Sequence, residues 1–164
     1  MKNKQYHNFT IIGVGKVGTA IGYLLNKAGH KVIAVYDKSA AALKRALPHT
    51  GGQVFHNPQA AIINADSILI ATPDDYIEAA CNEISVPKLI KGKFIFHMSG
   101  AGGLDLLEGA IKAGGTATAI HPLQSFSSVD NAVQNIPGSF FGITTTTAKA
   151  KKQAVAIVED LGGI

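Results

Sequence analysis

Hydrophobic positions along the chain follow two alternating patterns. Short runs of consecutive apolar residues, typical of strands buried on both faces of a sheet, are separated by segments in which apolar residues recur every three or four positions. The runs that predict strands are residues 9–12, 31–36, 53–55, 67–71, 93–98, 116–120 and 140–143. The alternation predicts an α/β fold: a doubly wound, mostly parallel sheet (a Rossmann fold) in three layers, α/β/α, with right-handed crossovers.

The segments with helical periodicity are residues 17–28, 40–47, 59–64, 75–84, 104–111 and 150–161. Pro48 is expected to end the second of these helices, and Asp75 and Glu78 have the spacing of a capping box for the fourth. Residues 122–139 show no clear periodicity and are longer than an ordinary loop, so they are expected to be functional or mobile.

A glycine-rich turn follows the first predicted strand, with the spacing Gly-x-Gly-x-x-Gly at Gly13, Gly15 and Gly18. Gly13 permits a tight turn, Gly15 lets a pyrophosphate approach the main chain, and Gly18 lets the helix pack closely on the sheet. Because the helix begins here, its free N–H groups and dipole can hold a diphosphate. The residues between the glycines complete the predicted cofactor-binding turn: Val14, Lys16 and Val17.

Asp37 ends the second predicted strand, roughly 20 residues after Gly18, where an acid can accept hydrogen bonds from an adenosine ribose. The sequence therefore predicts NAD or NADP as the cofactor. Asp37 would repel a 2′-phosphate, and Lys38 and Ser39 beside it could offset much of that repulsion. The repulsion by Asp37, only partly offset by its neighbours, favours NAD weakly over NADP.

Polar or glycine residues follow three further strands, and the carboxyl ends of parallel strands form the ligand-binding edge of an open sheet. Thr72, Pro73 and Asp74 would border the nicotinamide ribose, although Asp74 and Asp75 could simply cap a helix. His97 could be a hydrogen-bonded core histidine. The loop at Ser99 could be a plain tight turn. For His121 a functional role is favoured, because an imidazole suits proton transfer beside hydride transfer.

Composition narrows the function classes. The chain has 164 residues, 46% of them hydrophobic and 16% charged, a mean hydropathy of +0.19 and a net charge of +4. The basic residues form no stripe interleaved with aromatics, so nucleic acid is not an expected partner. No apolar run is long enough for a membrane span and the first residues lack the core of a signal peptide, so we expect a cytoplasmic protein. The single cysteine, Cys81, is expected to be a small buried hydrophobe, and no metal site is predicted.

Four motifs together resemble a known family: residues 13–18, 72–75, 97–101 and 121–126. They are similar to those of two-domain Rossmann-like oxidoreductases with an all-helical second domain of unknown function, related to pyrroline-5-carboxylate reductase, ketopantoate reductase and deazaflavin-dependent NADP reductase. The pair of Ser99 and His121 also resembles prephenate dehydrogenases, where a serine and a histidine before proline touch the reacting group. That resemblance implies catalytic roles for these two residues.

The resemblance spans essentially the whole chain and implies one NAD(P)-binding domain over residues 1–164, without the helical domain of the relatives. That domain helps form the substrate site and the dimer in relatives, so a homodimer is expected mainly through it. The expected activity is hydride transfer to or from a small anionic metabolite. Two alternatives remain: a dinucleotide-binding sensor or scaffold without turnover, and, ranked last, an S-adenosylmethionine methyltransferase.

Overall fold

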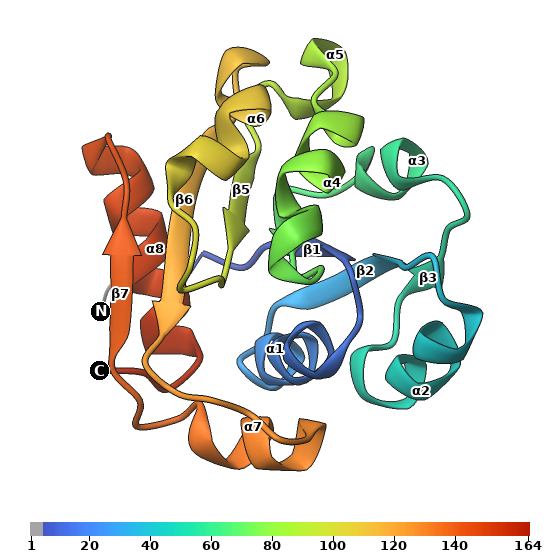
Figure 1. The fold of residues 1–164 in the computed structure, drawn as a ribbon, viewed down its shortest axis with the longest axis vertical. Helices are drawn as coiled ribbons and strands as arrows, with labels where there is room; N and C mark the ends of the chain where they lie inside the picture. Colours follow the sequence, from blue (N-terminus) through green and yellow to red (C-terminus); the bar gives the residue numbers. More distant parts are fainter. Residues whose placement is uncertain (1–4) are drawn as a thin grey trace.

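Seven strands form one sheet in a computed structural model that describes residues 5–164 (Figure 1). Their order across the sheet is β3-β2-β1-β4-β5-β6-β7, and every neighbouring pair is parallel except β6 and β7. The strands are β1 (Asn8–Ile12), β2 (Lys31–Tyr36), β3 (Gln53–Val54), β4 (Ser67–Ile70), β5 (Phe94–His97), β6 (Thr116–Pro122) and β7 (Phe141–Thr144). The predicted doubly wound, mostly parallel sheet is confirmed.

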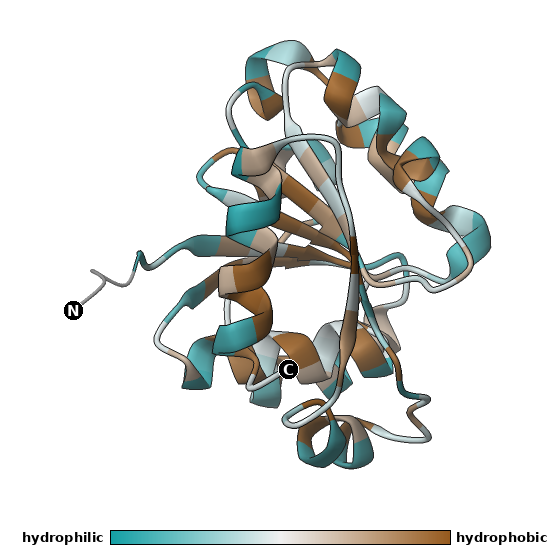
Figure 2. Cartoon of the chain, turned by 90° about the vertical axis from the view of Figure 1, so that its left-hand side faces the viewer, coloured by the Kyte–Doolittle hydropathy of each residue, from teal (hydrophilic) through white to brown (hydrophobic). Residues whose placement is uncertain are grey.

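Helices cover both faces of this sheet. They are α1 (Lys16–Lys27), α2 (Ala40–Thr50), α3 (Pro58–Ile62), α4 (Ile77–Ile84), α5 (Pro87–Ile90), α6 (Glu108–Lys112), α7 (Val129–Asn135) and α8 (Ala148–Asp160), with 3₁₀ turns η1 (Asp74–Tyr76) and η2 (Leu104–Leu107). One apolar core lies beneath α1, α2, α7 and α8, and a second beneath α3 to α6. Figure 2 shows the apolar residues gathered on the strands and on the inward sides of the helices. These are the three expected layers.

The prediction that Pro48 ends the second helix is wrong. Pro48 lies inside α2, which continues to Thr50. A proline removes one N–H donor, but its fixed φ is helical, so the chain can keep winding for a further turn. The helix ends instead at Gly51, which adopts φ +60° and donates its N–H to the Leu47 carbonyl at 2.9 Å.

The predicted capping box of Asp75 and Glu78 is also absent. The η1 turn precedes α4, and neither element has a side-chain cap. The Pro73 carbonyl accepts the Tyr76 N–H at 2.9 Å, so the backbone closes the turn and leaves Asp75 exposed to solvent. The expected apolar side of the 104–111 segment likewise needs correction, because Ile111 is 40% exposed while Leu107 and Ala110 are buried.

The segment 122–139, expected to be an irregular loop, contains the helix α7. Its N-cap is Ser128, whose hydroxyl accepts the Asn131 N–H, and its buried face packs against α1. Val129, Ala132, Val133 and Ile136 recur at helical spacing after this cap, which is a signal that sequence reasoning could have used. The segment therefore forms part of a helical layer.

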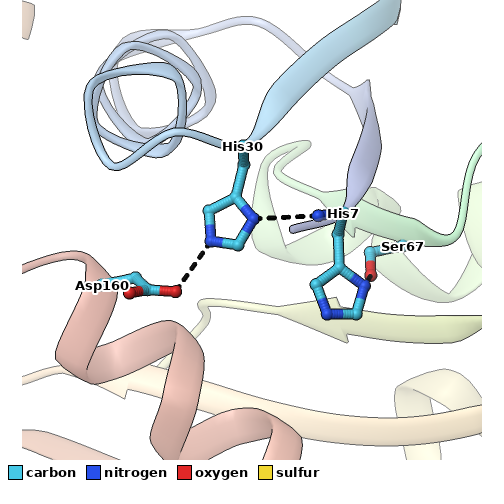
Figure 3. A network of polar contacts seen from close by, with 4 residues as sticks. All are labelled: His7, His30, Ser67 and Asp160. Carbon is cyan, nitrogen blue, oxygen red and sulfur yellow. Dashed lines mark hydrogen bonds and ion pairs between the residues drawn. The ribbon is translucent and has the colours of Figure 1, made fainter. Parts of the chain in front are cut away.

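A polar network joins the amino ends of the strands, opposite the predicted ligand edge (Figure 3). The buried His30 accepts the His7 N–H at Nδ1 (3.1 Å), and its Nε2 lies 2.8 Å from an oxygen of Asp160 at the end of α8. The Ser67 hydroxyl lies 3.5 Å from Nδ1 of His7. The network ties the last helix to the first two strands.

No helix within residues 5–164 has the length and apolar character needed to cross a membrane.

We expect the free energy of unfolding to fall between pH 7.5 and pH 5.5. Burial, and to a lesser degree the nearby His30, lower the pKa of His7 in the folded protein. The unfolded chain therefore takes up this proton near the ordinary value of about 6.5, before the folded chain does, and acidification favours unfolding. Urea unfolding at the two pH values measures the drop. A His7→Asn variant, which cannot titrate there, should show a smaller drop; an equal drop would contradict this role.

Candidate functional site

A cavity of about 720 Å³ lies at the carboxyl edge of the sheet, where the parallel strands β1, β2, β4 and β5 end. The structure brings most of the sequence-predicted site residues into its lining: Gly13, Gly15, Lys16, Val17, Asp37, Lys38, Thr72, Pro73, Asp74 and Ser99. The other four are not in the lining: Val14, Gly18, Ser39 and His121. Of the strand ends expected to converge here, those of β1, β4 and β5 do, together with Asp37 after β2, whereas His121 of β6 is not in the lining.

The three glycines of the turn differ in what surrounds them. Gly13 adopts φ +91°, and a Cβ there would fall 2.6 Å from the Thr72 nitrogen. A Cβ on Gly18 would fall 2.1 Å from the Gly13 carbonyl oxygen, so this glycine lets α1 approach the end of β1. A Cβ on Gly15 would meet nothing within 4 Å, and Gly15 is exposed in the cavity lining. The free space above Gly15 is space that a ligand can occupy.

The amino end of α1 opens into this cavity without a cap. Its N-cap is Gly15, which has no capping side chain, and its first turn contains no acidic residue. Within residues 5–164 the N–H groups of Lys16, Val17 and Gly18 have no hydrogen-bond acceptor. Free N–H groups at the positive end of a helix dipole form a site for an anion.

Asp37 joins the glycine turn to the second strand. One carboxylate oxygen accepts the Val14 N–H at 2.9 Å, and the other accepts the Ser39 N–H at 2.8 Å. Val14 and Ser39 do not line the cavity, but the backbone N–H of each holds the Asp37 carboxylate in place. Asp37 is half-buried and lines the cavity, and each oxygen can accept a further hydrogen bond from a ligand.

An apolar wall completes the cavity, and the sequence analysis missed it. Tyr36 ends β2, Tyr76 and Ile77 stand where η1 meets α4, Met98 follows β5, and Phe126 lies between β6 and α7. Ile77 and Met98 are buried, whereas Tyr76 is 61% exposed. Small-molecule sites are typically lined by apolar side chains together with a few oriented polar groups. Their position directly beside the predicted polar residues is the signal that could have identified them.

Thr72 and its neighbours lie between the glycine turn and β5. The Thr72 hydroxyl oxygen is buried and has no hydrogen-bond partner among the described residues. Buried polar atoms are rarely left without partners, so this hydroxyl is a group that a ligand could satisfy. Pro73 and Asp74 are exposed at the cavity rim.

Ser99 follows β5 in a short loop and is almost fully buried at the cavity wall. Its Oγ accepts the Ala101 N–H at 3.1 Å, which orients the hydroxyl. Within residues 5–164 no acceptor is found for the hydroxyl hydrogen, so it is available to a ligand. His97, expected as a core histidine, is fully buried and hydrogen-bonded at both ring nitrogens, as predicted.

His121 lies inside β6 rather than after it, paired with Gly142 of the antiparallel β7. Its ring lies close to Gly100 of the Ser99 loop: a Cβ on Gly100 would fall 2.3 Å from its Cε1 atom. Its Nδ1 is buried and has no hydrogen-bond partner in the described chain. The structure therefore places His121 against Gly100, the residue after Ser99, and outside the residues that line the cavity.

The chain belongs to the Rossmann-like domain family, whose model matches residues 3–122. Among curated proteins, none matches this chain.

Solved structures share the fold. A 3-hydroxyisobutyrate dehydrogenase from Mycobacterium tuberculosis (with L-serine) has a TM-score of 0.79 at 17% identity, covering 98% of this chain and 54% of its own. A prephenate dehydrogenase from Aquifex aeolicus, with hydroxyphenyl propionate and NAD⁺, has a TM-score of 0.78 at 20% identity (99% and 60%). An imine reductase variant from Myxococcus stipitatus with NAD⁺ has a TM-score of 0.74 at 16% identity, and the match covers 98% of this chain and 54% of the reductase. The chain thus spans 54–60% of the length of these three structures.

We expect Gly15 and Gly18 to respond in opposite ways to the same substitution. Gly18→Ala forces a Cβ against the Gly13 carbonyl and should lower the free energy of unfolding by about 1–3 kcal/mol. Gly15→Ala meets no atom and should leave stability unchanged or raise it by up to about 1 kcal/mol. Urea unfolding of the two variants measures both values, and equal losses would contradict this assignment.

Proposed function

We propose that the chain binds NAD(H) or NADP(H) in this cavity and forms the cofactor-binding part of an oxidoreductase. The observation that carries the proposal is the contrast among the glycines: Gly13 and Gly18 are enclosed by backbone, whereas Gly15 faces open space beside an uncapped helix. That arrangement fits a diphosphate, which needs close backbone approach and free N–H donors.

The remaining groups fit the other parts of a dinucleotide. Asp37 would hold the adenosine ribose, with Lys38 and Ser39 beside it, and the unsatisfied Thr72 hydroxyl would meet the nicotinamide ribose together with Pro73 and Asp74. The apolar wall, Tyr36 and Ile77 among it, offers a surface for an aromatic base. The structural neighbours from Aquifex aeolicus and Myxococcus stipitatus are complexes with NAD⁺, which supports this cofactor class.

The proposed chemistry is hydride transfer to or from a small anionic metabolite, with the nicotinamide supplying the hydride chemistry when it is bound. Ser99 would donate its oriented hydroxyl hydrogen to the oxygen or nitrogen of the reacting group. His121, with one ring nitrogen free of partners within residues 5–164, would exchange the accompanying proton. Since the chain covers 54–60% of the length of its structural neighbours, we propose that a helical domain outside this chain supplies the rest of the substrate site and most of a dimer interface.

Fluorescence titration of the wild-type protein with NADH and with NADPH should give saturable binding of at least one of them. Gly15→Val fills the free space above the turn and should weaken that binding by about tenfold or more, at an unchanged urea midpoint. Gly142→Val is the matched control, because the nearest atom to its Cβ lies 3.9 Å away and Gly142 lies outside the cavity lining. Binding of neither nucleotide by the wild type, or an unaffected Gly15→Val, would refute the proposal.

The choice between the two cofactors should depend on Asp37, and we expect the wild type to favour NADH. Asp37→Ala removes a negative charge from the 2′-phosphate position and should shift the NADH-to-NADPH affinity ratio toward NADPH by at least about fivefold, since like charges 4 Å apart repel by about 1 kcal/mol even in water. The ratio is the right measure because both cofactors would bind the same glycine turn, so that loss of the Val14 contact acts on the affinity for each. Asp74→Ala, at another strand end, is the control. An unchanged ratio in Asp37→Ala would place Asp37 away from the ribose.

A further inference from the structure

His97 is the last residue of β5, between Ile70 of β4 and Ala119 of β6, and it is fully buried. Both of its ring nitrogens make hydrogen bonds to the same loop. Nδ1 accepts the Ser99 N–H at 3.1 Å, and Nε2 donates to the Gly103 carbonyl at 2.9 Å. Both partners of the ring therefore belong to one loop of five residues.

The two bonds close the segment 99–103 on itself. The imidazole holds its first residue by the backbone N–H and its last by the carbonyl. Between them, Ser99 Oγ accepts the Ala101 N–H, so the serine side chain is fixed by the same loop. The direction of the Ser99 hydroxyl at the cavity wall therefore depends on the His97 ring.

The loop also determines where His121 lies. Gly100 is the residue after Ser99 and lies so close to the His121 ring that it leaves no room for a side chain: a Cβ would fall 2.5 Å from Nε2 and 2.9 Å from Nδ1. A shift of the loop would remove that contact. His97 is thus linked to two side chains indirectly, to that of Ser99 through the Ser99 backbone N–H and to that of His121 through Gly100.

We propose that His97 is a positioning residue, which fixes the 99–103 loop so that the Ser99 hydroxyl and the His121 imidazole hold a constant relation to one another. This inference deepens the proposed function and rests on it, because Ser99 and His121 are the residues assigned to the reacting group.

The protonation state of His97 agrees with this role. Burial lowers its pKa, while the Gly103 carbonyl, Asp74 and Asp105 oppose that effect and His121 adds to it. A ring that stays neutral can accept a hydrogen bond at Nδ1 and donate one from Nε2 at the same time, whereas an imidazolium could only donate.

Three variants test the inference by NMR on the nucleotide-free protein. His97→Leu removes both hydrogen bonds. His97→Asn restores the first, because an asparagine side-chain oxygen readily accepts the N–H two residues on, which here is that of Ser99. His30→Leu is the matched control. His30 is also buried, accepts a backbone N–H at Nδ1 and contacts the Asp160 carboxylate through Nε2, but it lies at the opposite edge of the sheet (Figure 3).

We expect His97→Leu to speed hydrogen exchange of the Ser99 amide by about tenfold and to move the ring Cε1–Hε1 resonance of His121. His97→Asn should keep Ser99 exchange within about threefold of the wild type, since the same N–H stays bonded. His30→Leu should lower the melting temperature while leaving Ser99 and His121 unchanged. Equal changes in His97→Leu and His30→Leu, or no change in either, would overturn the inference. Should His97→Leu not fold, a tenfold faster Ser99 exchange in His97→Asn would overturn it.

NADH titration separates this inference from the proposed function. Gly15, Asp37 and Thr72 follow other strands than β5, so His97→Leu should bind NADH within about threefold of the wild type. A wild type that binds neither NADH nor NADPH refutes the proposed function whatever the loop measurements give. A wild type that binds NADH beside an unmoved His121 resonance in His97→Leu refutes the positioning role alone.

Discussion

The close approach of α1 to the end of β1 is the constraint on which the cavity depends. Gly18 stands where any side chain would collide with the Gly13 carbonyl, and Gly13 in turn lies against the Thr72 nitrogen. Two segments far apart in sequence, the glycine turn that opens α1 and the end of β4, thus meet mainly through backbone atoms. Because no side chain separates them, the free N–H groups of α1 and the Thr72 hydroxyl open into one cavity rather than into separate surface clefts.

Asp37 adds a second link between neighbouring strands. Its carboxylate bonds the Val14 N–H of the glycine turn and the Ser39 N–H at the start of α2. A substitution at this position therefore acts on the shape of the turn as well as on any ribose nearby. Asp37 therefore has a role in the fold that the sequence analysis did not predict, besides the ribose contact that we propose for it.

Features of the fold and the site that depend on local sequence patterns could be predicted from the sequence, whereas those that depend on contacts between distant segments could not. The strands, the glycine turn and the convergence of Thr72 and Ser99 depend on local patterns and on the rules of parallel sheets, and these predictions agree with the structure. The apolar wall could not be separated from the core, because Ile77 and Met98 are apolar residues of the kind that fill any interior. The predicted core role of His97 was correct but incomplete, since its bond to Gly103 depends on how a loop without periodic pattern returns to the strand. The Pro48 and Asp75 predictions failed because backbone hydrogen bonds replaced the expected side-chain and proline effects.

The reversed direction of β7 has a consequence for the design of fragments. Pairing between β5 and β6 ends at Ala119, so Ile120, His121 and Pro122 are held as strand only by β7, which runs back along them from Phe141. The glycine turn, Asp37 and Thr72 depend on the other side of the sheet. A fragment that stops before residue 141 would leave these three residues as an unpaired sheet edge, and it would also lose the α8 side chains that fill the core on one face of the sheet.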